Sequence, residues 1–153
     1  MRHIVEYNIG LGLLLLPAVA FGQARYINAP DLAPPNGYSH AVVVNRGRVV
    51  YVSGAVALDA KGNVVGPGDF TAQAQQAFAN LRSALKAAGA TPADIVKLDY
   101  YVVGLDHDKV LALRVARDAF IDKAHPPAST LIGVQELFRD DVMIEIEATA
   151  ALP

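Results

Sequence analysis

The sequence predicts a single α+β domain in which two helices cover one face of a sheet. Its 153 residues are enough for one domain with a sizeable core and too few for two ordinary domains. Short β-branched runs alternate with only two stretches of helical periodicity. Two helices cannot cover both faces of a sheet of about six strands. We therefore expect a partner to bury the other face.

The composition excludes several classes of protein. Hydrophobic residues make up 53% and charged residues 18%, which is not typical of a disordered chain. The net charge is −2, whereas a protein that binds nucleic acid through phosphate contacts usually has a basic excess. The absence of cysteine excludes disulfides, thiolate metal sites and cysteine nucleophiles.

The first residues have the pattern of an export signal. A weakly positive start precedes an uncharged apolar run, residues 9–16, and small residues that allow cleavage after Ala20 or Ala24. This run is shorter than the ~20 residues that span a bilayer. We expect residues 1–24 to be a secretory signal peptide and residues 25–153 to be one periplasmic or secreted domain. The alternative is an N-terminal helix or strand of a cytoplasmic protein.

The first half of the domain is predicted to contain a hairpin. Prolines and a glycine make residues 28–38 irregular. Two β-branched runs follow, at residues 41–45 and 48–53, with Gly47 in the short connection between them. This spacing favours an antiparallel hairpin.

Helical periodicity then predicts a helix over residues 70–88. Apolar residues recur along one face of this segment, Asp69 is in position to cap its start, and Gly89 follows its end. A strand is predicted at residues 95–103, and it places Tyr100 on the same face as its aliphatic neighbours.

A second helix is expected to start at Asp106 or Asp108 and to continue to about Lys123 before the Pro-Pro pair. The last two strands are predicted at residues 131–134 and 142–150.

The final strand separates apolar from acidic side chains. Val142, Ile144 and Ile146 alternate with Met143, Glu145 and Glu147, so the two glutamates point away from the isoleucines. They are solvated if that face is open, and they need a specific role if it lies in an interface.

No motif indicates a metal or a cofactor. The four histidines form no HExxH arrangement, and no G-x-S-x-G is present. The acidic residues of Asp106-His107-Asp108 lie at a predicted helix start, where we interpret them as favourable to the helix dipole rather than as metal ligands.

Six short pieces nevertheless occur in an order and spacing that resemble the Rid family of reactive-intermediate deaminases, also called YjgF-like or L-PSP-like proteins. The resemblance extends from about Tyr26 to Leu152. The pieces are Pro35-Asn36-Gly37-Tyr38-Ser39, Tyr51-Val52-Ser53-Gly54, Gln73…Gln76…Asn80-Leu81…Leu85…Ala88-Gly89, Ala93-Asp94-Ile95-Val96-Lys97, Pro126-Pro127-Ala128 and Glu145-Ile146-Glu147-Ala148.

This resemblance implies a chorismate-mutase-like fold, a six-stranded mixed sheet with two helices on one face. It also implies a homotrimer with small-molecule pockets at the subunit interfaces, and hydrolysis of enamines or imines to a carbonyl compound and ammonia without cofactor or metal. The family match makes Glu145 the carboxylate that holds the attacking water. The substrate-binding positions that match are Tyr38 over the pocket, Ser53 and Gly54 in its wall, and Ser129, Thr130 and Leu131 in the strand that supplies backbone contacts.

The sequence departs from the deaminating members at one position in particular. They carry an arginine after Pro-Ala that grips the substrate carboxylate, and this chain has Ser129 there. Either the substrate lacks a carboxylate or another cation supplies the charge. Arg114 is our candidate, although a solvent-exposed helix arginine is the alternative interpretation. A second departure is Ala55, where many members have glutamine.

Three functions remain open from the sequence. The first is an imine or enamine hydrolase with altered substrate preference. The second is a small-ligand-binding or stress-protective trimer without turnover. The third is an endoribonuclease, which the net charge of −2 and the absence of tryptophan disfavour. We expect neither a nucleic-acid partner nor stable membrane association after signal cleavage.

Overall fold

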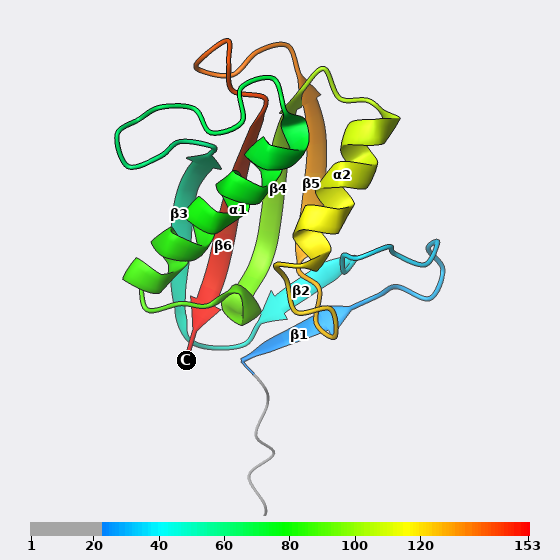
Figure 1. The fold of residues 1–153 in the computed structure, drawn as a ribbon. Helices are drawn as coiled ribbons and strands as arrows, with labels where there is room; N and C mark the ends of the chain where they lie inside the picture. The colour runs from blue at the N-terminus through cyan, green and yellow to red at the C-terminus, as the bar shows by residue number, and fades with distance from the viewer. Residues whose placement is uncertain (1–22) are drawn as a thin grey trace, which may run out of the picture.

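The computed structural model describes residues 23–153, and its six strands divide between two sheets (Figure 1). The elements in chain order are β1 (Ala24–Ile27), β2 (Ala41–Val44), β3 (Arg48–Val56), α1 (Phe70–Ala87), a 3-10 turn (Pro92–Asp94), β4 (Ile95–Val103), α2 (His107–Asp118), β5 (Ala128–Val134) and β6 (Ile144–Leu152).

The larger sheet has four strands in the order β3-β6-β4-β5, and the smaller sheet is the β1-β2 pair. β4 and β5 run parallel, whereas β6 is antiparallel to both β3 and β4, so the larger sheet is mixed. Both helices lie in front of this sheet in Figure 1. The predicted α+β class, with two helices on one face of a mixed sheet, is confirmed, although the strands do not form one continuous six-stranded sheet.

The predicted hairpin between residues 41–45 and 48–53 is wrong. β2 pairs with β1, and β3 pairs with β6. The chain changes sheets at Gly47, which has a φ of +112° and packs against the Leu152 carbonyl so closely that a side chain would overlap it. Gly47 is therefore needed where the chain passes from one sheet to the other. The sequence around it would look the same if Gly47 lay in a tight hairpin turn.

Helix α1 begins and ends where its local signals predict. The Asp69 carboxylate accepts the Ala72 N–H at 3.0 Å, and Gly89 adopts a φ of +76° after the last turn. The Asp69 carboxylate thus satisfies a backbone N–H that has no partner within the helix. The positive φ of Gly89 lets the chain change direction where the helix ends.

Helix α2 starts at the predicted cap but is shorter than predicted. Asp106 accepts the Lys109 N–H at 2.8 Å, which confirms capping. The helix ends at Asp118 rather than near Lys123. Just beyond the helix end Phe120 is buried against Phe78, with ring centroids 4.7 Å apart, so a tertiary contact accompanies the earlier end.

The core lies between the helices and one face of the larger sheet. Its fully buried side chains include Leu81 and Leu85 from α1, Leu98 from β4, and Ile144 and Ile146 from β6. The alternation predicted for the final strand is confirmed by its burial pattern.

The opposite face of the larger sheet, which we call the open face, carries polar and exposed side chains. Asp99 is opposite Glu147 and Tyr101 is opposite Glu145 in the β4-β6 register. Tyr51 on this face is 82% exposed. One face of the sheet is therefore uncovered within a single chain.

The predicted signal peptide falls mostly on residues 1–22, which lie outside the described residues. Ala24, one of the two predicted cleavage positions, is already paired with Val44 in β1. Among the described residues, no helix is long and apolar enough to cross a membrane.

Candidate functional site

Glu145 lies on the open face, beside a local irregularity in β3. The register of the β3-β6 pair shifts between Val52 and Ala55, which is the signature of a bulge. Gly54 lies in this bulge, and a side chain there would overlap the Glu145 carboxylate. Burial, with a smaller contribution from the negative charge of Glu147, raises the pKa of Glu145 above its ordinary value. A partly desolvated carboxylate with raised proton affinity suits a general base.

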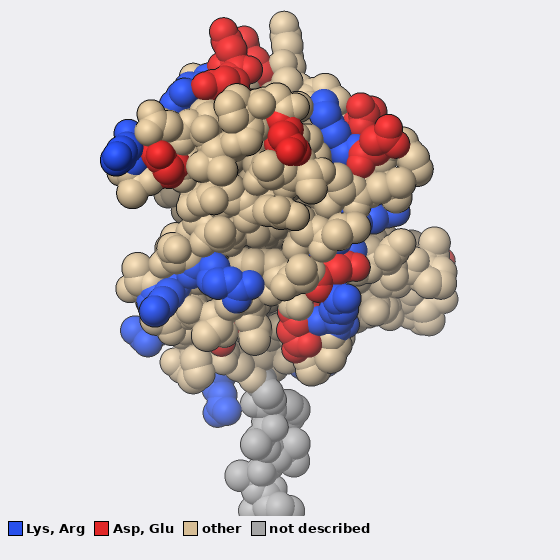
Figure 2. Space-filling model, viewed as in Figure 1, with Lys and Arg blue, Asp and Glu red and all other residues tan. Residues whose placement is uncertain are grey.

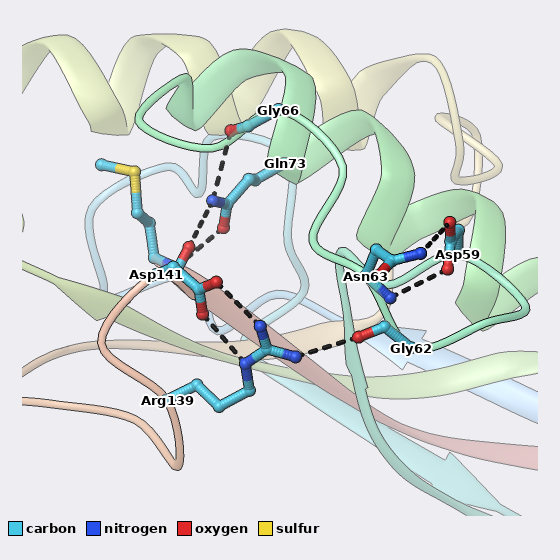
Figure 3. A network of polar contacts seen from close by, with 8 residues as sticks. Asp59, Gly62, Asn63, Gly66, Gln73, Arg139 and Asp141 are labelled. Atoms are coloured by element: carbon cyan, nitrogen blue, oxygen red, sulfur yellow. Dashed lines mark hydrogen bonds and ion pairs between the residues drawn. The ribbon is translucent and has the colours of Figure 1, made fainter.

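The start of β6 is held by Gln73, a fully buried polar residue of α1 (Figure 3). Its Nε2 donates to the Asp141 carbonyl at 2.8 Å and to the Gly66 carbonyl at 3.3 Å. Its Oε1 accepts the Met143 N–H at 2.8 Å, two residues before Glu145. Gln73 thus positions the strand that carries the candidate base.

Arg139 fixes the loop that precedes β6. Arg139 donates to both carboxylate oxygens of Asp141, at 2.9 and 2.8 Å, and to the Gly62 carbonyl at 3.0 Å (Figure 3). In the adjacent loop Asp59 accepts from the Asn63 side chain at 3.0 Å, and this bond lowers the pKa of Asp59. The bond from Arg139 to the Gly62 carbonyl therefore joins the two loops at this end of the sheet, and it is charge-assisted.

A separate cavity of about 210 Å³ lies between β5 and α2, and we call it the α2 cavity. It brings together four of the predicted site residues from three distant parts of the sequence. These are Tyr38, Arg114, Ser129 and Leu131, and the remaining lining residues are Asn36, Tyr100, Val110, Leu113 and Arg117.

Tyr38 is positioned by contacts of the residues on either side of it. Gly37 has a φ of +74°, and the Arg117 guanidinium occupies the space that a side chain at this position would need. Ser39 donates from its hydroxyl to the Pro126 carbonyl at 2.7 Å and from its N–H to the Pro127 carbonyl at 3.0 Å. The loop is therefore fastened to the chain just before β5.

Two residues of the α2 cavity, Arg117 and Tyr100, were not among the predicted site residues. Arg117 is only 7% exposed and donates to the Asp118 carboxylate from Nε at 2.9 Å and from Nη2 at 2.7 Å. Burial raises the pKa of Tyr100 well above its ordinary value. Sequence signals for both existed, since Arg117 shares a helix face with Arg114 and Tyr100 was predicted to point into the core.

The predicted substrate-binding residues of β5 do not share one face. Ser129 and Leu131 line the α2 cavity, whereas Thr130 lies on the open face and accepts a hydrogen bond from Lys97 at 2.8 Å. Lys97 also forms an ion pair with Asp99. The alternation of side chains along a strand produces this separation.

The predicted site therefore divides into two groups within one chain. Glu145, Ser53 and Gly54 lie at the β3-β6 side of the larger sheet. Tyr38, Arg114, Ser129 and Leu131 lie beside β5, the strand at the other edge. Strand β4 lies between β6 and β5, so no single cavity of the described residues contains both groups.

Metal ligands are not gathered in the part of the chain that the structure describes. No group of three or more histidine, aspartate or glutamate residues within residues 23–153 has the geometry to hold a metal ion.

This α+β fold has two helices on one face of a mixed sheet, and Gly54 and Glu145 lie together on the open face. The class of protein with this fold is that of the YjgF-like proteins. The chain belongs to the Rid family of YjgF-like proteins, because residues 27–152 match the family model described as endoribonuclease L-PSP.

Similar proteins support this assignment along most of their length. A protein from Dermatophagoides farinae named 2-iminobutanoate/2-iminopropanoate deaminase is 32% identical over 129 residues, covering 84% of this chain and 96% of the relative. A protein of the same name from Salmonella typhimurium is 34% identical over 125 residues, with coverages of 80% and 91%. A crystal structure of a Yersinia pestis protein of unknown function from the Rid family matches with a TM-score of 0.81 and 45% identity, covering 85% of this chain and 99% of that one.

Proposed function

We propose that this protein hydrolyses a reactive imine or enamine to a carbonyl compound and ammonia, with a substrate preference different from that of arginine-bearing relatives. The observation that carries the proposal is the Glu145 carboxylate, which has a raised pKa and lies against Gly54. The deaminase names of the relatives in D. farinae and S. typhimurium support the reaction class. Ser129 in place of the family arginine supports the altered preference.

The chemistry requires only water and one carboxylate. Glu145 accepts a proton from water while the water oxygen forms a bond to the imine carbon, and the electron pair of the C=N double bond moves to nitrogen. Glu145 passes this proton to the nitrogen, which gives a carbinolamine. Glu145 then takes the proton of the new hydroxyl and delivers it to the nitrogen, so the C–N bond breaks and ammonia leaves as the C=O bond forms. An enamine enters the same sequence after protonation at its β-carbon and loss of one proton from its nitrogen give the imine.

The two groups of site residues favour an assembly in which copies complete one another. In a closed homotrimer the β5 edge of one copy would approach the β3 edge of the next and would bring Arg114 toward Glu145 of a neighbour. Exposed apolar side chains support such a contact, with Leu131 38% exposed at β5 and Val49 48% exposed at β3.

Ammonia release from freshly generated imines tests the function. An amino-acid oxidase can generate 2-iminopropanoate from alanine, and cyclic imines without a carboxylate complete the panel. We expect Glu145→Gln to lower kcat/KM by about 10²- to 10⁴-fold with binding of the product retained. No rate above background on the whole panel would exclude the enzyme.

Binding of a carbonyl compound without any turnover would instead favour the second function, a ligand-binding trimer, and the serine at position 129 is the observation that keeps it open. An endoribonuclease is less well supported. On the face shown in Figure 2, basic and acidic side chains are interspersed, so that face offers no continuous basic track for RNA.

A further inference from the structure

Asn36 is the only asparagine of the chain that is followed by glycine, and it lies in the loop between β1 and β2. The side chain of an asparagine can react with the main-chain nitrogen of the next residue and close a five-membered ring. Glycine as the next residue favours this closure, because it has no Cβ to hinder the approach. The Asn36-Gly37 pair is therefore a candidate for spontaneous chemical modification.

The structure leaves both reacting groups free. Asn36 is exposed to solvent, and the pair lies in a bend outside the helices and strands. Within residues 23–153, neither the Asn36 carboxamide nor the Gly37 N–H makes a hydrogen bond. Ring closure at this position therefore breaks no hydrogen bond of either reacting group.

The other asparagines of the described region are less well placed to react. Each of them is followed by a residue with a side chain, and they are Asn28, Asn45, Asn63 and Asn80. Asn28 also accepts the His40 N–H at 3.1 Å, and Asn63 donates to the Asp59 carboxylate at 3.0 Å. These bonds restrain the carboxamides, so we expect Asn36 to react first.

We propose that Asn36 is a deamidation site and that Arg117 directs the reaction toward isoaspartate. The Gly37 nitrogen loses its proton and bonds to Cγ of Asn36, the carboxamide C–N bond breaks, and ammonia leaves with that proton. Water then opens the resulting succinimide by adding its hydroxyl to one carbonyl carbon and its other proton to the ring nitrogen. Attack at Cγ gives aspartate. Attack at the main-chain carbonyl carbon breaks its bond to nitrogen and gives isoaspartate, in which the chain continues through Cβ and Cγ.

Arg117 contacts the carbonyl that decides between these products. Its Nη1 donates to the main-chain carbonyl of Asn36 at 3.4 Å. A guanidinium beside this carbonyl stabilises the negative charge that develops on the oxygen when water attacks its carbon. Opening at that carbon also converts the same carbonyl into the free carboxylate of isoaspartate, so Arg117 gains a charge-assisted contact. The guanidinium is held for this role, because Asp118 accepts from its Nε at 2.9 Å and from its Nη2 at 2.7 Å.

Isoaspartate at position 36 is expected to displace Tyr38. It lengthens the main chain by one methylene group beside Gly37, which packs against the Arg117 guanidinium. On the other side, two hydrogen bonds fasten Ser39 to the chain before β5. The added length is taken up between these fixed points, where Tyr38 lines the α2 cavity. The effect on activity rests on the proposed function, whereas the modification itself does not.

Mass spectrometry of the full-length protein after incubation at mildly alkaline pH tests the site. Trypsin releases residues 26–46 as one peptide, in which Asn28 and Asn45 are internal controls, and digestion at mildly acidic pH limits reaction after unfolding. We expect a gain of about 1 Da at Asn36, at least about tenfold faster than at either control. Asn36→Gln should abolish the gain, because glutamine closes its larger ring much more slowly. Equal rates at the three asparagines, or no gain at Asn36, would overturn the site.

The ratio of isoaspartate to aspartate tests the part of Arg117. Electron-transfer fragmentation distinguishes the two products. The ratio should be at least about twofold higher in the folded protein than in the same protein unfolded in urea, where Arg117 no longer faces residue 36. Arg117→Gln should lower the ratio to the urea value, whereas Arg114→Gln, at an exposed arginine of the same cavity, should leave it unchanged. Equal ratios in the folded and the unfolded wild type would overturn the role of Arg117 without reference to any variant.

Turnover measured on the same samples separates this inference from the proposed function. We expect imine hydrolysis by the wild type to fall in step with the isoaspartate content, while Asn36→Gln incubated in parallel keeps its starting activity. Modification of Asn36 in a protein that hydrolyses no imine would support the site and count against the enzyme. Full turnover after complete conversion to isoaspartate would overturn the displacement of Tyr38, and an active enzyme that never gains mass at Asn36 would overturn the site alone.

Discussion

The Glu145 carboxylate occupies the space that a side chain at position 54 would need. The two residues come from β3 and β6, which pair antiparallel with a bulge at Gly54. Gly54 has no positive φ, so steric space rather than backbone conformation explains the need for glycine there. The bulge at Gly54 in β3 therefore makes room for the carboxylate of Glu145 in β6.

Gly54→Ala should reduce activity much more than stability. The methyl group would displace the flexible end of Glu145 rather than backbone atoms, so the melting temperature should change little. A shift of the carboxylate by about 1 Å is expected to cost on the order of 100-fold in kcat/KM. Imine hydrolysis and thermal unfolding measure the two effects separately.

The double variant Gly54→Ala/Glu145→Gln is the control for this prediction. If the methyl group acts only through the carboxylate, adding it to Glu145→Gln should cause almost no further loss. Full additivity of the two losses would contradict the mechanism.

Glu145→Gln should stabilise the fold at neutral pH and have no effect in acid. The pKa of Glu145 is raised, so the folded state binds more protons than the unfolded state between the ordinary and the raised pKa. Wild-type stability therefore falls as pH rises through this window, and glutamine removes the unfavourable charge. Urea unfolding of both proteins across this pH range measures the difference, and parallel curves at every pH would contradict it.

Gln73→Ala should destabilise the protein strongly. It leaves the Met143 N–H and the Asp141 carbonyl without their partner in two partly buried hydrogen bonds, and it opens a small cavity where the fully buried Gln73 side chain was. The expected loss is about 2–3 kcal/mol in the free energy of unfolding. Gln75→Ala, on the exposed face of the same helix, is the matched control and should stay within about 0.5 kcal/mol. Similar values for the two variants would show that the network in Figure 3 is unimportant.

A charge on the open face should disrupt the proposed homotrimer. Ile132 in β5 is 41% exposed and is opposite Tyr101 in register. Ile132→Asp should shift the protein to a monomer in sedimentation experiments and abolish turnover, because an unpaired carboxylate would be buried at the interface. Leu111→Asp is the matched control, since Leu111 is 45% exposed on α2. A wild-type protein that sediments as a monomer would also exclude the trimer.

If the N-terminal segment is an export signal, we expect cleavage after Ala20 rather than after Ala24. The Gln23 carbonyl accepts the Asn45 N–H at 2.9 Å, and Ala24 pairs with Val44, so the later cleavage would remove part of β1. Intact-mass measurement of protein from the periplasmic fraction identifies the new terminus. A chain that retains Met1 and is found in the cytoplasm would contradict export.

Local signals in the sequence were sufficient to predict several helix ends and the buried face of β6. Asp69, Gly89 and Asp106 mark helix ends through hydrogen bonds and backbone angles that involve only nearby residues. The alternation around Ile144 and Glu145 placed the core face of β6 because side-chain direction in a strand has a period of two. These interactions are local, so they are readable one segment at a time.

Strand pairing was not determined in this way. The runs on either side of Gly47 fit a hairpin equally well, but the partners β1 and β6 are distant in the chain. Helix α2 similarly ended earlier than its local pattern predicts, and Phe120 just beyond it packs on Phe78 of α1, a residue distant in the chain. Competition among distant partners decides such cases, and no local pattern contains that comparison.

The sequence by itself determined the family, the two helices, and the identity of Glu145 and Arg114 as residues to examine. Only the tertiary structure decided that these two residues lie in separate groups, and that Tyr100 and Arg117 join Arg114 around one cavity. Proximity of side chains far apart in the chain depends on how strands pair and how helices pack on them. A linear pattern specifies which face of an element a side chain occupies, whereas the meeting of two faces is a property of the whole fold.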